Sequence, residues 1–206
     1  AREAVQASVV PLFDSGVLPI PAGLSVLAAG EALDDIGIAC GGWTISWAGA
    51  PGPITTGRTV LDGLRRCLGD DAVVHDPMGR FGDDAPRATV GVVTVHELPY
   101  VEGGGDRADL RVPDEQIQVV RRVRTLVEHL VVVVVSGRPV MLGDVHELAD
   151  AIVACWLPGS EADGVADVLC GVVPFSGRLP MAWPHTDNEI GPDTPPVERT
   201  TGAPSW

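Results

Sequence analysis

The sequence predicts an α/β domain in which a mainly parallel sheet is flanked by helices. Several short runs are continuously apolar, without the alternation of a half-exposed strand, as strands buried on both faces require. The segments between them carry apolar residues at helical spacing. Alternation of such strands and helices implies right-handed crossovers and an open parallel sheet covered by helices. A chain of 206 residues is long enough for one sizeable core.

The predicted strands are short runs rich in valine and isoleucine. They comprise residues 24–29, 72–75, 90–95, 130–135 and 151–157. The predicted helices carry apolar residues three or four positions apart, and one follows Pro113, which suits a helix start. They comprise residues 59–68, 114–128, 140–149 and 161–169.

Both ends of the chain differ from this regular pattern. The first residues, 1–5, already follow a helical pattern, which suggests a segment of a longer protein. Residues 184–206 contain several prolines and have no periodic apolar pattern, so we expect an irregular tail after a domain that spans 1–183.

Composition excludes several classes of partner. The net charge is −14 and all 14 basic residues are arginine, so the acidic balance argues against a nucleic-acid partner. The valine run at 131–135 is far too short to cross a membrane. The four cysteines form no CxxC pair and the five histidines show no metal spacing, so no metal or other cofactor is expected. Cys155 and Cys170 lie in apolar stretches and are expected in the core, although a disulfide stays open.

The candidate site lies in the loops that follow the predicted strands, because open parallel sheets bind ligands beyond the carboxyl ends of their strands. These loops are residues 30–49, 96–106, 136–139 and 158–161, and all four should meet at one edge. They are rich in Glu, Asp, Trp and Gly, which is the composition of a sugar site. Carboxyl groups do acid/base work on glycosidic oxygens, and indole faces stack on sugar rings.

Other chemistries find less support in the same loops. Residues 30–35 read Gly-Glu-Ala-Leu-Asp-Asp, which is not the GxGxxG of a dinucleotide site. Residues 103–105 lack the Lys and Ser/Thr of a phosphate loop, and the GxSxG of a serine hydrolase is absent. His96, at a strand end beside Glu97, is a weaker candidate for a ligand contact.

Seven short motifs follow one another in order over roughly residues 1–190. They are DDIG at 34–37, CGGWTISW at 40–47, TVLDGL at 59–64, PYVEGGGD at 99–106, SGRP at 136–139, WLPGSE at 156–161 with GVADVL at 164–169, and FSGRLP at 175–180. In these motifs the chain resembles glycoside hydrolase family 3, specifically the second domain of its β-glucosidases and β-glucan exohydrolases. The resemblance implies a fold of the (α/β)6-sandwich type.

The resemblance implies a retaining, exo-acting mechanism shared between two domains. A preceding barrel domain would supply an aspartate nucleophile, and Glu102 matches the acid/base that the second domain supplies. Trp47 matches the outer wall of the sugar slot. Glu102 would protonate the leaving oxygen of a β-glucoside or oligosaccharide and then deprotonate a water, with its pKa raised for the first step. The family is compatible with a secreted or periplasmic location, which the sequence itself leaves open.

Several alternatives stay open for individual residues. Glu97 is a second candidate for the acid, although its strand-end position favours a role in organising loops. Trp43 is expected in the core, and Glu161, at a predicted helix start, is expected to be structural. Because the chain contains no barrel and no nucleophile motif, it is not expected to hydrolyse glycosides alone. A non-catalytic carbohydrate-binding or interaction module is therefore the alternative function.

The sequence also departs from the family pattern at single positions. Phe13 and Asp14 stand where the family has Lys and Asn, and His96 stands where Gly is usual. Cys170 replaces a usual Phe.

Overall fold

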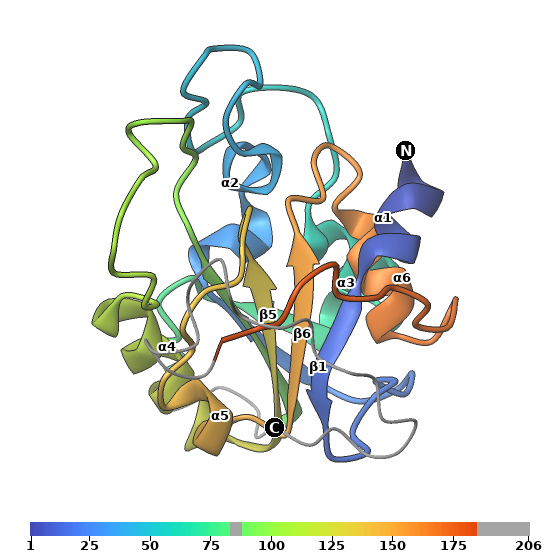
Figure 1. Cartoon of the computed structure of the whole chain (residues 1–206). Coiled ribbons are helices and arrows are strands. Elements are labelled where there is room, and N and C mark those ends of the chain that lie inside the picture. The colour runs from blue at the N-terminus through green and yellow to red at the C-terminus, as the bar shows by residue number, and fades with distance from the viewer. Residues whose placement is uncertain (83–87, 185–206) are drawn as a thin grey trace.

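The computed structural model describes residues 1–82 and 88–184, and it shows one sheet covered by helices on both faces (Figure 1). The sheet has six strands in the order β1-β6-β5-β4-β2-β3. Strands β2 to β6 are parallel to one another, and β1 at the edge pairs with β6 in the antiparallel direction. The strands are β1 (Val10–Asp14), β2 (Val26–Ala29), β3 (Val73–His75), β4 (Ala88–His96), β5 (Val127–Val135) and β6 (Ala151–Trp156).

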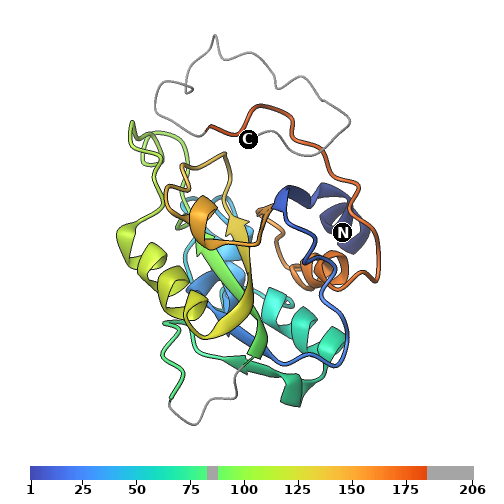
Figure 2. The same ribbon diagram turned by 90° about the horizontal axis from the view of Figure 1, so that it is seen from below.

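Helices on the two faces build two separate core clusters (Figures 1 and 2). On one face lie α1 (Arg2–Ser8), α3 (Val60–Leu68) and α6 (Asp163–Leu169), and on the other lie α4 (Asp114–Arg124) and α5 (Val145–Leu148). The short elements η1 (Glu31–Asp34) and α2 (Ile36–Cys40) follow β2, and η2 (Asp70–Ala72) precedes β3. None of the helices that can be described is long and apolar enough to cross a membrane.

Burial on both faces explains the valine run of β5. Val131, Val133 and Val135 belong to the cluster under α3 and α6, whereas Val132 and Val134 belong to the cluster under α4. All five side chains are fully buried. At roughly 1.5–3 kcal/mol for each large apolar side chain removed from water, this central strand is a major source of stability.

The predicted α/β class is confirmed, with the element boundaries adjusted. Each of the five predicted strands is present, and the helical pattern at the start is α1. The helix predicted over 114–128 ends at Arg124, because 127–135 form β5 instead. The helix predicted over 140–149 is reduced to Val145–Leu148, after Gly143 with φ of 52°. Apart from residue 184, the tail predicted over 184–206 lies outside the described residues.

The antiparallel edge strand β1 was not predicted. Its sequence, VPLFD, includes Pro11, which would be unfavourable in a central strand because proline cannot donate to the ladder. The pairing with β6 shifts register between Pro11 and Phe13, so an irregularity at the edge accommodates the proline.

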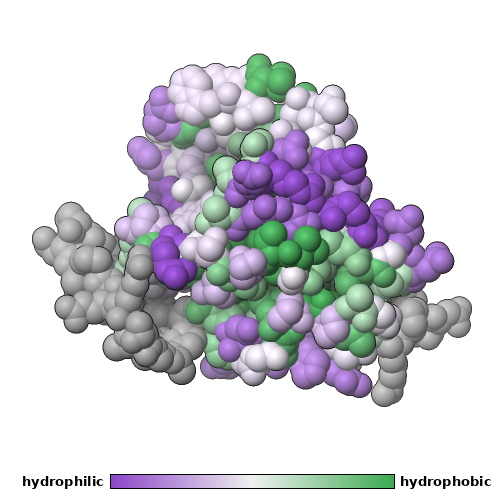
Figure 3. All heavy atoms as spheres, turned by 90° about the vertical axis from the view of Figure 1, so that its right-hand side faces the viewer, coloured by the Kyte–Doolittle hydropathy of each residue, from purple (hydrophilic) through white to green (hydrophobic). Residues whose placement is uncertain are grey.

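A cluster of charges joins the three helices on one face. Asp167 of α6 is only 2% exposed and accepts hydrogen bonds from Arg2, Gln6 and Arg66. Asp163, one turn earlier, also pairs with Arg2. Burial alone would raise the pKa of Asp167, but the hydrogen bonds from Arg66, Gln6 and Arg2 hold it below its ordinary value. The arginines are about one-third exposed. Figure 3 views the side of the molecule that carries α1 and α6, and hydrophilic residues form a band across it.

We expect Asp167→Asn to lower the free energy of unfolding by about 1–3 kcal/mol at neutral pH, because the ionised carboxylate is the stronger acceptor. A depressed folded-state pKa contributes stability above the unfolded value of about 3.9, and that contribution is lost as the pH falls through the folded value. Urea unfolding of parent and variant should therefore converge at acidic pH. Asp109→Asn, in the exposed pair with Arg111, is the control and should change stability by less than about 0.5 kcal/mol. An Asp167→Asn variant as stable as the parent at neutral pH would contradict this role.

Candidate functional site

The four loops at the carboxyl ends of the strands meet, as the sequence predicts. The N–H of Glu97 after β4 donates to Val135 at the end of β5 (3.1 Å), and the N–H of Ser136 donates to Trp156 at the end of β6 (3.1 Å). The N–H of Gly159 after β6 donates to Ala39 in α2, at 2.8 Å. Neighbouring loops are therefore joined in turn through backbone hydrogen bonds.

Asp35 organises the loop that follows β2. Its carboxylate caps α2 by accepting the N–H of Ile38 at 2.8 Å and also accepts the N–H of Gly52, at the far end of the loop. Within the loop, the N–H of Trp43 donates to the carbonyl of Trp47 at 2.9 Å and closes a tight turn. Both ends of this tryptophan-bearing segment, residues 43–47, are thus fixed by short-range polar contacts.

The two tryptophans of this segment are exposed. Trp43 is 67% exposed and Trp47 is 57% exposed, and their rings meet edge to face with centroids 6.2 Å apart. The prediction that Trp43 lies in the core is therefore wrong. The backbone explains this, because positive φ values at Trp43 and Ile45 turn the segment outward from the sheet.

The tryptophan loop touches the loop that carries Glu102. Gly42 lies against the backbone of Tyr100, and a Cβ atom there would come within 2.2 Å of the Tyr100 carbonyl oxygen. Only glycine permits this approach. The loop after β2 and the loop after β4 therefore meet at the upper end of the sheet (Figure 1).

Glu102 stands at the start of a projecting turn. Val101 is buried, and its carbonyl accepts the N–H of Gly105 at 2.7 Å, while the carbonyl of Glu102 accepts the N–H of Gly104 at 2.9 Å. Gly103 and Gly104 have open space around them, and Glu102 is exposed. The turn is anchored at its base and presents the carboxyl group to the outside.

Glu97 occupies the opposite environment, although it lies only five residues earlier. It is 8% exposed, and its Oε1 accepts from Arg107 at 2.9 Å and from Nε and Nη2 of Arg138 at 3.0 and 2.9 Å. The guanidinium of Arg138 also lies 4.4 Å from the centre of the Tyr100 ring. Burial and the Glu97 carboxylate raise the pKa of Tyr100. Glu97 thus connects two loops, in the organising role that the sequence favours.

His96 is the last residue of β4 and directly precedes Glu97. Gln116 of α4 holds the backbone of His96 through two hydrogen bonds, of 2.7 and 3.0 Å. The ring is buried, and its Nε2 lies 3.8 Å from Glu31. Burial lowers the pKa of His96, although Glu31 and Asp35 act in the opposite direction. The ring lines a hollow of about 390 Å³ together with the segment 97–100 and Arg107.

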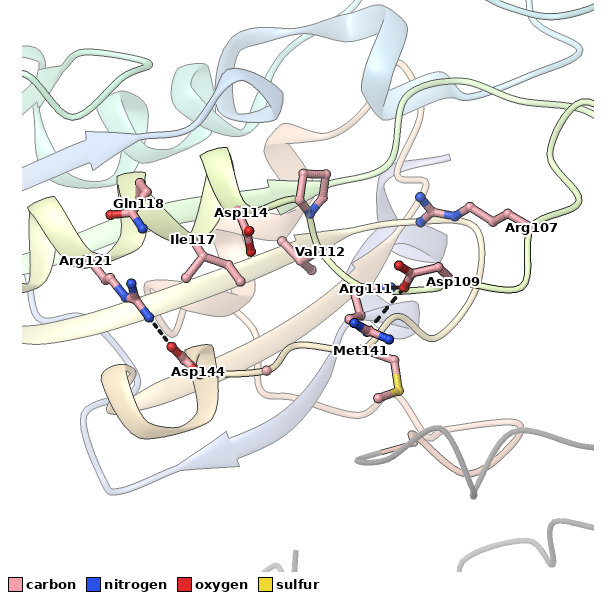
Figure 4. Close-up of a pocket in the computed structure, with 12 residues that line it drawn as sticks. Arg107, Asp109, Arg111, Val112, Asp114, Ile117, Gln118, Arg121, Met141 and Asp144 are labelled. Atoms are coloured by element: carbon pink, nitrogen blue, oxygen red, sulfur yellow. Dashed lines mark hydrogen bonds and ion pairs between the residues drawn. The ribbon is translucent and has the colours of Figure 1, made fainter.

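A larger hollow, of about 830 Å³, lies between the segment 107–114 and residues 141–144 (Figure 4). Its arginines are paired with carboxylates: Arg121 with Asp144, and Arg111 with Asp109. Their charges are therefore largely balanced. Neither Glu102 nor Trp47 lines this hollow or the one beside His96. Within the described residues, no group of His, Cys, Asp and Glu side chains could hold a metal ion.

Some organising residues were not singled out from the sequence. Asp35 and Arg138 lie within the quoted motifs, but their roles depend on contacts with Gly52 and Glu97 that are distant along the chain. Glu161, expected at a helix start, precedes α6, which begins at Asp163, and instead forms a parallel bridge with Arg58. Of the two cysteines expected in the core, Cys155 is fully buried, whereas Cys170 is only half-buried.

Comparison with known proteins agrees with this architecture. The model of the glycosyl hydrolase family 3 C-terminal domain matches residues 12–204. A lysosomal beta glucosidase from Dictyostelium discoideum is 31% identical over 81% of this chain and 23% of the relative. A periplasmic beta-glucosidase from Salmonella typhimurium is 26% identical over 92% of this chain and 29% of the relative.

Solved structures show the same similarity. The exo-1,3/1,4-beta-glucanase from a Pseudoalteromonas species superposes with a TM-score of 0.81 at 30% identity, over 95% of this chain and 26% of that chain. A beta-glucosidase from Listeria innocua, in complex with glucose, gives a TM-score of 0.76 at 27% identity, over 92% of this chain and 27% of that chain. The chain thus spans about a quarter of the length of these proteins. It belongs to glycoside hydrolase family 3, as a C-terminal domain of the kind found in the family's β-glucosidases.

Proposed function

We propose that this domain supplies Glu102 as the acid/base of a retaining, exo-acting β-glucosidase-like site, with the nucleophile on a separate barrel domain. The observation that carries the proposal is the exposed Glu102 on a turn anchored beside the tryptophan loop. An acid group that must reach a sugar held by another domain has to project from the surface of its own domain.

The environments of the two candidate acids favour Glu102 over Glu97. Glu97 is buried, and its carboxylate forms ion pairs with both Arg107 and Arg138, so it is engaged in holding the neighbouring loops together. Glu102, by contrast, lies at the outer surface, in contact with water. Different environments for two nearby carboxyl groups are the usual way in which one site assigns two roles.

In the proposed reaction, protonated Glu102 donates its proton to the glycosidic oxygen as the nucleophile attacks the anomeric carbon. The resulting carboxylate then removes a proton from water, which frees the sugar from the glycosyl-enzyme. The exposed indole of Trp47 offers a flat apolar surface against which the sugar ring can stack. The two carboxyl groups of a retaining pair lie roughly 5–5.5 Å apart, so the barrel would have to bring its aspartate that close to Glu102.

We expect Glu102→Gln to lower the turnover of an aryl β-glucoside by about 10²–10⁴-fold when the chain is joined to the barrel of a family 3 relative. The loss should be smallest for aryl groups that leave without protonation. Azide should restore turnover of those substrates, because it attacks the glycosyl-enzyme without needing a general base. Steady-state kinetics with and without azide measure both effects.

Glu128→Gln is the matched control, since Glu128 is an exposed glutamate at the amino end of β5 and far from the loops. It should leave kcat and KM unchanged. If the Glu102→Gln fusion turns over aryl glucosides as fast as its parent, Glu102 is not the acid.

Glu97→Gln tests the organising role separately. Without its charge, residue 97 should hold Arg107 and Arg138 less firmly, and displacement of the neighbouring loop should cost about 10–100-fold in kcat/KM. Arg138→Lys should give a smaller loss, because lysine keeps the charge but cannot make the two-point contact. Azide should rescue neither variant, since each retains Glu102. Rescue of Glu97→Gln by azide would instead assign the acid/base role to Glu97.

The exposed tryptophan pair supports a second candidate function, a non-catalytic carbohydrate-binding module. On this hypothesis the isolated chain should bind glucose or short β-glucans with a dissociation constant of about 1 mM or tighter, equivalent to at least about 4 kcal/mol. Calorimetry should show heat for the parent and much less for Trp47→Ala, with Arg178→Ala on a different segment as the control. Titrations of the parent that give no heat at millimolar sugar would count against this function.

A further inference from the structure

Two helices, α3 and α6, pack closely along their length on one face of the sheet (Figure 2). Gly63 of α3 lies against Ala166 and Asp163 of α6, where a Cβ atom would approach the Cβ of Ala166 to 2.7 Å. The absence of a side chain at Gly63 therefore sets a short distance between the helices. One turn further along each helix, the same close packing brings Cys67 of α3 beside Asp167 and Cys170 of α6.

The contacts of Cys67 place it on this interface. Its Sγ lies 4.0 Å from Oδ1 of Asp167, and it interacts electrostatically with Cys170, which caps α6 three residues after Asp167 on the next turn. Both cysteines pack against the edge of the core and are half-buried. Small reagents can thus reach a pair of thiols that the fold already holds together.

We propose that Cys67 and Cys170 form a disulfide that fastens α3 to α6 when the protein meets a small-molecule disulfide as oxidant. The thiolate of Cys67 attacks one sulfur of the oxidant, forms a mixed disulfide and releases one thiolate. The thiolate of Cys170 then attacks the Cys67 sulfur and releases the second thiolate. Two protein thiols are oxidised to one disulfide, the oxidant is reduced to two thiols, and the protons pass from the cysteines to the released thiolates.

The surroundings of the thiols set the order of these steps. Burial and the neighbouring Cys67 raise the pKa of Cys170 to about 12, so its thiolate is scarce at neutral pH. Cys170 therefore suits the second, intramolecular attack, in which proximity compensates for a small thiolate fraction. The mixed disulfide should consequently be detectable on Cys67 before the ring closes, and closure should accelerate as the pH rises.

The position of the bond predicts its effect. The amino end of α3 adjoins the ligand edge, where Arg58 donates to Ser160, and the cysteines lie at the opposite end of the helix pair. The bond should therefore stabilise the fold without displacing Glu102 or Trp47. Closing a loop of about 100 residues constrains the unfolded chain, which corresponds to a rise in Tm of about 10–20 °C for a domain of this size.

The other two cysteines serve as matched controls. Cys155 is fully buried in β6, where its thiol contacts the carbonyl of Val134 at 3.3 Å. Cys40 ends α2 at the ligand edge of the sheet, whereas Cys67 lies at the carboxyl end of α3, away from that edge. Neither Cys40 nor Cys155 is therefore expected to form a disulfide with Cys67.

The test treats the purified full chain with oxidised glutathione, traps free thiols by alkylation, and maps the cysteines by mass spectrometry. We expect a peptide that joins Cys67 to Cys170, and a Tm increase that a reductant reverses. Cys67→Ser and Cys170→Ser should each lose the increase, whereas Cys40→Ser should keep it.

Three results would overturn the proposal: four cysteines that all remain alkylatable after oxidation and unfolding, a disulfide that includes Cys40 or Cys155, or covalent dimers in place of the internal bond. The peptide map of the parent chain decides among these even if a serine variant fails to fold. A Cys67→Ser variant that still gains the full Tm increase would equally contradict it.

Discussion

The parallel arrangement of β2 to β6 is the constraint on which the rest of this domain depends. Each crossover returns the chain to the same edge, so the loops after β2, β4, β5 and β6 must share one surface. Both faces of the sheet are covered, and all of β2 and the last six residues of β5 are buried, which limits movement of the strands. The site residues therefore inherit their positions from strands that have little freedom to move, while their own loops stay at the surface.

Glu97 connects the loop that carries Glu102 to the loop after β5 through its two arginine partners. A buried carboxylate is costly to desolvate, and it is tolerated here because two guanidinium groups donate to it. Breaking either contact would leave the buried carboxylate with one guanidinium group instead of two, so both contacts favour a single arrangement of the loops of Arg107 and Arg138. Arg138 also lies over Tyr100, whose backbone meets Gly42. A single buried carboxylate thus connects the segment that leads to Glu102 with the tryptophan loop.

Much of this architecture can be predicted from the sequence, whereas the remainder depends on contacts between residues that are far apart along the chain. Continuous valine runs predict buried strands because a strand covered on both faces needs apolar residues at every position. The same reasoning does not predict edge strand β1, because VPLFD contains Pro11 and has mixed polarity instead of a continuous apolar run. The exposure of Trp43 depends on a positive φ that composition does not reveal. The resemblance draws attention to Glu102, but the link from Glu97 to Arg138 spans 41 residues and requires the fold.

The contrast between Glu97 and Glu102 has a consequence for how the proposed acid would work. The domain pairs Glu97 with its own arginines, whereas it leaves Glu102 in contact with water. A general acid needs a raised pKa, and burial or a neighbouring negative charge supplies it. In the proposed function both arise only when the sugar and the nucleophile's domain cover the turn. Trp43, Ile45, Trp47 and Leu98 expose large apolar side chains in the loops at this edge, which suits a surface that a ligand or another domain covers. Proton donation by Glu102 would then be coupled to assembly of the complete site.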